Sequence, residues 1–77
     1  MTRDAAKRVI DELLGASRAL NESVRLLQAE ASDSLFRAYR KRAAEVMAAV
    51  YLDLVKPIAN DYPDLDPGGP NALGPGE

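Results

Sequence analysis

The residues best suited to chemistry in this chain are carboxylates, because the sequence contains no histidine and no cysteine. The chain therefore lacks the commonest general base and metal ligand, and it has no thiol or disulfide. Acids that work together in a helical protein project inward at i, i+3 or i+4. Asp11 and Glu12 are adjacent and diverge, while Glu45 and Asp53 are eight residues apart on a polar side. We therefore expect no catalytic residue and no bound cofactor.

A second group of acids, Asp61, Asp64 and Asp66, lies in the segment DYPDLDPGG. This density of carboxylates is typical of calcium loops, but the spacing differs from that of an EF-hand and no closing glutamate follows. We expect no metal site here. Asp53 interrupts the most apolar stretch, EVMAAVYLDLVKPIA, yet it falls beside Lys56 on the narrow polar side of a helix. We expect Asp53 to be exposed and able to pair with Lys56.

Basic residues form the third group, near the middle of the chain. Its members are Arg25, Arg37, Arg40, Lys41 and Arg42. Such a cluster is a candidate contact for an anion, an acidic partner or a nucleic-acid phosphate. The i,i+4 pairs of Asp33 with Arg37 and of Lys41 with Glu45 favour the alternative of a solvated helix end.

The overall charge does not indicate a general nucleic-acid binder. Residues 1–59 hold all ten basic residues and eight of the twelve acids, whereas the segment from Asn60 onward holds four acids and no base. The net charge is −2 over 77 residues, enough chain for one small domain with a marginal core. No apolar run approaches 18 residues, and the N-terminal segment lacks the apolar core of a signal peptide. We expect a cytoplasmic protein without a membrane span.

Two segments have the apolar period of a helix. The first shows the alternating four-three spacing of a heptad seam at Ala6, Ile10, Leu13, Leu20, Val24, Leu27 and Ala31. The second shows a stripe at Phe36, Tyr39, Ala43, Met47, Val50, Leu54 and Ile58. These patterns predict helices over about residues 3–31 and 34–61, with Thr2 as the first N-cap and a kink near Pro57. Residues 62–77 form an irregular acidic tail rich in proline and glycine.

The segment ASDS, residues 31–34, favours a turn between the helices over one continuous helix. Ser32, Asp33 and Ser34 are good N-caps and poor mid-helix residues, and the first apolar phase breaks there. Because no glycine or proline separates the segments, one long helix stays open as the alternative. We predict an all-α fold, an antiparallel two-helix hairpin.

The second helix has more apolar surface than one neighbouring helix covers. Its apolar arc spans roughly 180°, against roughly 120° for the first helix. We therefore predict that two hairpins pack their open ends into a dimeric four-helix bundle; a different helical protein is the alternative partner. The predicted interface comprises Val9, Ile10, Leu13, Leu14, Met47, Val50, Tyr51, Leu54, Val55 and Ile58.

These features predict a non-catalytic protein–protein interaction module that acts as a scaffold, adaptor or small regulator. Two other classes stay open. A nucleic-acid-associated regulator would use the basic cluster at the turn, and a small enzyme or ligand carrier would hold a pocket inside the bundle. Salt-dependent nucleic-acid binding would indicate the first, and an inward-facing acid in the core would indicate the second.

Overall fold

The computed structural model describes residues 1–68, and this part of the chain is all-helical, without strands. Helix α1 spans Arg3–Glu30 and helix α2 spans Asp33–Ala49. A π-helix, η1 (Val50–Val55), continues α2 without a break into α3 (Lys56–Asp61), and a short 3-10 helix, η2 (Pro63–Leu65), follows. The final part of the predicted tail, 69–77, lies outside the described residues.

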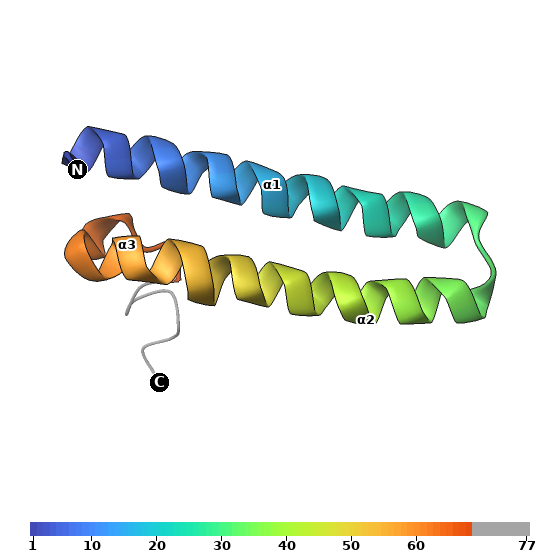
Figure 1. The fold of residues 1–77 in the computed structure, drawn as a ribbon. Helices are drawn as coiled ribbons and strands as arrows, with labels where there is room; N and C mark the ends of the chain where they lie inside the picture. Colours follow the sequence, from blue (N-terminus) through green and yellow to red (C-terminus); the bar gives the residue numbers. More distant parts are fainter. Residues whose placement is uncertain (69–77) are drawn as a thin grey trace, which may run out of the picture.

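The two helical arms lie side by side and run in opposite directions (Figure 1). One arm is α1, and the other is formed by α2, η1 and α3. Near the turn, the hydroxyls of Ser23 and Tyr39 are hydrogen-bonded at 2.8 Å. At the other end, which we call the open end, the Tyr62 hydroxyl donates to the Met1 carbonyl and Arg3 pairs with Asp64. The molecule is 44 Å along its longest axis.

Side-chain caps set where both long helices begin. The Thr2 hydroxyl oxygen accepts from the Ala5 amide at 3.1 Å, which confirms Thr2 as the N-cap of α1. Of the three candidate caps in the turn, Ser32 caps α2, because its hydroxyl accepts from the Leu35 amide at 3.3 Å. Each cap satisfies an amide that has no partner inside its own helix.

The core between the arms is narrow and made of small side chains. Its buried residues are Ala6, Ile10, Ala43, Val55 and Ala59. Three of these are alanines, so little side-chain volume separates the two arms at those positions. One chain therefore buries only a thin seam, and the larger apolar residues beside it stay half-buried or exposed.

The π-helix before Pro57 changes which residues of the second arm face α1. Proline has no amide hydrogen, and in a regular α-helix its ring clashes with the carbonyl four residues earlier. Here the Lys56 amide donates to the Tyr51 carbonyl five residues back, which widens the turn just before the proline. One extra residue in the turn rotates all later residues by about 100° relative to a regular helix. A π segment thus lies where the sequence predicts a kink.

This rotation changes part of the predicted stripe. Regular α-helical spacing from Ala43, Met47 and Val50 leads to Leu54 as the next inward residue. In the structure Val55 is 1% exposed and Leu54 is 50% exposed. The prediction that Leu54 continues the seam is therefore wrong, because the extra residue of η1 places Val55 in the seam.

We predict that Val55→Ala lowers the free energy of unfolding by about 1–3 kcal/mol, because it removes buried methyl groups and leaves a cavity. The matched control, Leu52→Ala, changes an exposed residue of the same π-helix and should alter stability by no more than about 0.5 kcal/mol. Urea denaturation followed by circular dichroism measures both. A neutral Val55→Ala would show that the π-helical phase is absent in solution.

Candidate functional site

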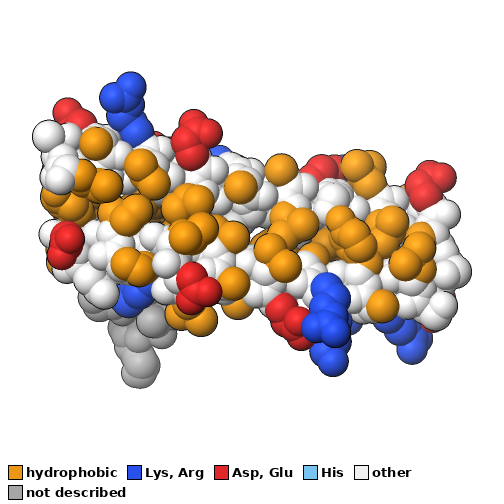
Figure 2. Space-filling model, in the orientation of Figure 1, with side chains coloured by type: hydrophobic (Ala, Val, Ile, Leu, Met, Phe, Trp, Pro, Cys, Tyr) orange, Lys and Arg blue, Asp and Glu red, His pale blue; other side chains and the backbone are white. Residues whose placement is uncertain are grey.

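One side of the molecule carries exposed apolar side chains from both arms, and we call it the apolar face. It carries Val9, Leu35, Val46 and Leu54, which are 39%, 52%, 52% and 50% exposed. Figure 2 views the molecule from a side on which hydrophobic side chains gather between the two arms along their whole length. Exposed apolar surface arranged continuously in this way is typical of protein–protein contact sites.

Helical spacing places these residues on one side. Leu35 and Val46 are eleven residues apart, which is three α-helical turns. Val46 and Leu54 are eight apart, and because η1 contains one extra residue this separation equals two turns. On α1, Val9 precedes Ser23 by two heptads, so the two residues lie on the same side of that helix. Ser23 is hydrogen-bonded to Tyr39 of α2, and Tyr39 precedes Val46 by one heptad, so Val9 and Val46 share this side. The π-helix therefore aligns Leu54 with the apolar face.

The opposite side of the open end is covered by the chain's own residues 63–68. Pro67 and Gly68 line a shallow pocket together with Leu14 and Tyr51. Gly68 lies so near the Tyr51 ring that an added Cβ would be 3.0 Å from the phenol oxygen. A larger residue at this position would require the Tyr51 ring or the segment to shift by a few tenths of an ångström.

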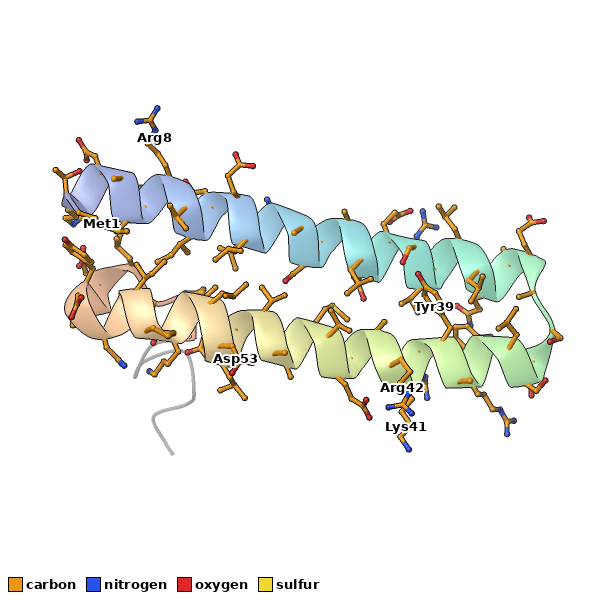
Figure 3. All side chains as sticks on the ribbon, in the orientation of Figure 1. Met1, Arg8, Tyr39, Lys41, Arg42 and Asp53 are labelled. Carbon is orange, nitrogen blue, oxygen red and sulfur yellow. The ribbon has the colours of Figure 1, made fainter. Side chains whose placement is uncertain are left out.

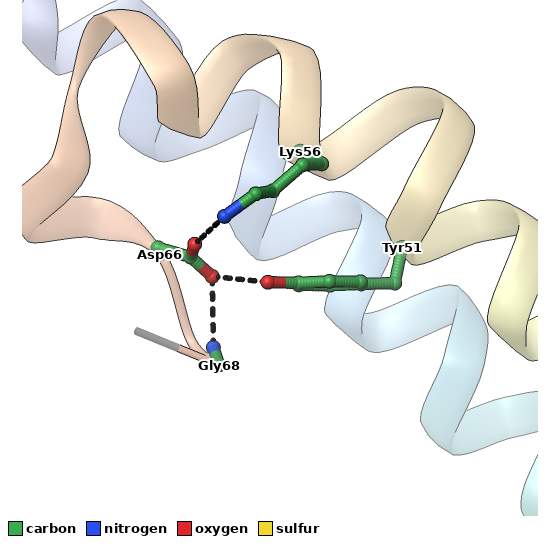
Figure 4. A network of polar contacts seen from close by, with 4 residues as sticks. All are labelled: Tyr51, Lys56, Asp66 and Gly68. Atoms are coloured by element: carbon green, nitrogen blue, oxygen red, sulfur yellow. Dashed lines mark hydrogen bonds and ion pairs between the residues drawn. The ribbon is translucent and has the colours of Figure 1, made fainter. Parts of the chain in front are cut away.

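Asp66 fixes this segment to the second arm (Figure 4). Its carboxylate accepts hydrogen bonds from the Tyr51 hydroxyl at 2.7 Å, from the Lys56 ammonium at 2.9 Å and from the Gly68 amide at 2.9 Å. The Asp66 side chain is only 6% exposed, although it is charged. A charge withdrawn from water is stable only when its oxygens are satisfied in this manner.

The hydrogen bonds change the pKa values of all three ionisable partners. Donation from Tyr51, and then from Lys56, lowers the pKa of Asp66 because both stabilise the carboxylate. The hydrogen bond to Asp66 raises the pKa of Tyr51, and it raises the pKa of Lys56 as well. At the same end of the molecule, the hydrogen bond from Arg3 lowers the pKa of Asp64.

The structure divides the predicted interface residues among four environments. Ile10 and Val55 are buried inside one chain, at 2% and 1% exposure, and are not free to contact a partner. Leu14 and Tyr51 lie under residues 67–68 on the covered side. Val9 and Leu54 lie on the apolar face. The remaining members are half-buried: Leu13, Met47, Val50 and Ile58.

The structure also adds residues that the sequence reasoning missed. Leu35 and Val46 belong to the apolar face but not to the predicted interface. Both lie beside the apolar stripe of the second helix and are not members of it. The sequence indicates Asp66 only as a candidate metal ligand. Lys56 pairs with Asp66, not with Asp53, and no spacing rule signals a contact between residues ten apart.

The basic cluster is only partly brought together. Arg37, Arg40 and Lys41 line an open groove of about 730 Å³ with an apolar floor that includes Val24 and Met47. The guanidinium of Arg40 lies 5.7 Å from the centre of the Phe36 ring. Arg25 and Arg42 are not among the residues that line this groove.

Local ion pairs occupy several of these cations. Arg37 pairs with Asp33 at 3.0 Å, as the i,i+4 spacing predicts. Glu45 pairs with Arg42 at 3.0 Å, not with Lys41 as predicted. Arg25 pairs with Glu22.

Metal-binding clusters and membrane-spanning helices are both absent from residues 1–68. No cluster of three or more histidine, cysteine, aspartate or glutamate side chains in this range is arranged to hold a metal ion. No helix in the same range has the length and apolar character needed to cross a membrane.

Comparison of the chain with family models, with curated proteins and with solved structures finds no match.

We predict that Asp66→Asn lowers the Tyr51 pKa toward its ordinary value of 10.0, because an amide stabilises the neutral phenol less than a carboxylate does. NMR of the tyrosine ring carbons, titrated with base, resolves each tyrosine separately. Asp64→Asn is the matched control, since Asp64 pairs with Arg3 at a distance from Tyr51. An unchanged Tyr51 pKa in Asp66→Asn would show that the contact does not form.

We also predict acid release of residues 63–68. Because the folded pKa of Asp66 is lowered, its stabilising effect is complete above the ordinary value of 3.8 and is lost as the pH falls through the lower, folded value. The protection of the Gly68 amide, which is its exchange rate compared with that of an unstructured chain at the same pH, should fall in this acid range, as measured by NMR. In Asp66→Asn the protection should be low at all pH values, and an acid-dependent loss of protection that persists there would contradict this assignment.

Proposed function

We propose that the chain is a helical hairpin that works as a non-catalytic protein–protein interaction module by pairing with a second copy of itself into a four-helix bundle. The observation that carries the proposal is the row of half-exposed Val9, Leu35, Val46 and Leu54 on one face. Burial of this row removes apolar surface from water, which is the main favourable term in association. A small chain with a narrow core gains the most from such a partner.

Residues 63–68 lie on the side of the open end opposite the apolar face. This position favours the apolar face as the contact surface for a second copy. Residues 63–68 cover Leu14 and Tyr51, held by the Asp66 hydrogen bonds. Apolar surface at the open end is thereby removed from one side, while Val9 and Leu54 stay accessible on the other. An open apolar face of this kind fits a closed dimer, because a twofold interface uses the same patch on both copies.

We predict a solution mass of twice 8.3 kDa at micromolar concentration, measured by sedimentation equilibrium. Leu54→Lys, which places a charge on the apolar face, should shift the mass to that of one chain. Leu52→Lys is the matched control, because Leu52 is 60% exposed but lies two residues away from the face. A wild-type mass of 8.3 kDa, or equal dissociation by both variants, would overturn the proposal.

A second candidate function is contact with nucleic-acid phosphates through the groove beside α2. Arg37, Arg40 and Lys41 line it, and Arg40 and Lys41 form no ion pair with another described residue. Cations that are not already paired are the ones that release counterions from a phosphate backbone. Dimer symmetry would double their number.

We predict for this second function that binding to single- or double-stranded nucleic acid weakens steeply with salt and is lost in Arg40→Glu/Lys41→Glu. Arg8→Glu/Arg18→Glu changes the net charge equally at other positions of the helix pair and is the matched control. Fluorescence anisotropy at low salt measures both. The absence of binding at low salt, or equal loss in both double variants, would exclude the groove as a phosphate site.

A further inference from the structure

Charge is divided unequally between the two ends of the molecule. The half that contains the turn, residues 17–46, holds six basic and four acidic residues. The open half, 1–16 and 47–68, holds four basic and seven acidic residues. One end is thus positive and the other negative. Two copies attract when opposite ends meet and repel when like ends meet.

Arg42 and Asp53 are charges of opposite sign on the edge of the second arm, one in the positive half and one in the negative half. Figure 3 shows both on the edge of this arm that is turned away from α1. The Arg42 side chain pairs with Glu45 of its own chain and is still 80% exposed, so it can accept a second acidic neighbour. Asp53 is exposed and forms no ion pair with another described residue. They lie on either side of residues 47 and 48, the middle of the arm from Asp33 to Asp61. A twofold axis through this midpoint exchanges their positions.

We propose that two copies dock through the apolar face in an antiparallel arrangement, with the turn of each lying over the open end of the other. This inference rests on the proposed dimer and specifies its geometry. The second arm of one copy packs along the second arm of its partner in the opposite direction. Arg42 then lies opposite the partner's Asp53, and the twofold symmetry forms this ion pair twice. The row of Leu35, Val46 and Leu54 meets its own copy between these pairs.

The alternative arrangement, with both turns at the same end, brings like charges together. It places the second arm of one copy over α1 of the other at the same height along the bundle. Leu14 and Tyr51 line one pocket, and Ser23 is hydrogen-bonded to Tyr39. These contacts align the two antiparallel arms so that Asp53 lies level with about residues 9–12 of α1. There it would approach the partner's Glu12. Exposed charges interact only within about 8–10 Å at physiological salt, so these near neighbours decide the orientation.

A distance between two spin labels tests the orientation directly. The chain has no cysteine, so Ser34→Cys introduces one labelling site per copy, at the turn. In the antiparallel dimer the two labels lie at opposite ends of a molecule 44 Å long. In the alternative both labels lie at the same end of the bundle, where neighbouring helices are about 8–10 Å apart, so the labels are separated by about two such spacings or less. A long distance by pulsed electron resonance is expected, and a short one overturns the inference.

Charge reversal tests the pair that sets the orientation. Arg42→Glu and Asp53→Arg should each weaken dimerisation by about three- to tenfold, because each breaks two exposed ion pairs and creates two repulsions. The double variant Arg42→Glu/Asp53→Arg should dimerise more tightly than either single variant but less tightly than the wild type, because Arg42→Glu also removes the ion pair with Glu45. In the alternative arrangement Asp53→Arg alone would strengthen the dimer, since it would face the partner's Glu12. Such strengthening would also overturn the inference.

The two proposals fail in distinguishable ways. A wild-type chain that stays monomeric at micromolar concentration overturns both the dimer and its geometry. A stable dimer with a short label distance leaves the dimer standing and removes only the antiparallel arrangement. Circular dichroism of each variant at the same concentration shows whether the helices persist. Arg8→Glu serves as the control for charge reversal, because the Arg8 side chain points away from the second arm (Figure 3).

Discussion

The missing amide hydrogen of Pro57 is the constraint on which the second half of the structure depends. A proline four residues before the end of a helical arm would ordinarily kink it. The π-helix Val50–Val55 instead absorbs the misfit, because its wider turn moves the carbonyls of the preceding residues away from the proline ring. The arm keeps its contact with α1 to the open end. The result is a rotation that places Val55 and Ala59 in the seam and Leu54 outside it.

That rotation has consequences on both sides of the helix pair. On one side it aligns Leu54 with Val46 and Leu35, which makes the exposed apolar row continuous. On the other, Tyr51 and Lys56 both reach the carboxylate of Asp66. The hydrogen bonds to Asp66 hold residues 63–68 against Leu14 and Tyr51. The π-helix Val50–Val55 therefore contributes to both sides of the helix pair, to the apolar face on one and to the contacts with Asp66 on the other.

The narrow core explains why the chain needs either a partner or a small, well-fitted seam. Alanines at Ala6, Ala43 and Ala59 let the arms approach closely, but they bury little area each. Larger residues are placed at the edges of the seam, where a second pair of helices would complete their burial. In the proposed dimer, the unequal charge of the two ends would supply the orientation that apolar contact alone does not specify.

The sequence by itself determined the helical class, the positions of the two long helices and the cap at Thr2, because apolar period and capping are local properties. It offered three caps for the second helix, Ser32, Asp33 and Ser34, of which the structure uses Ser32. It also indicated the apolar excess of the second arm and the ion pair of Asp33 with Arg37. Only the tertiary structure decided the phase after Val50, since helical spacing assumes a constant turn and the π-helix does not keep it. The contact of Asp66 with Tyr51 and Lys56 was likewise decided in three dimensions, because a chain reversal at Tyr62 brings together groups that no periodic pattern connects.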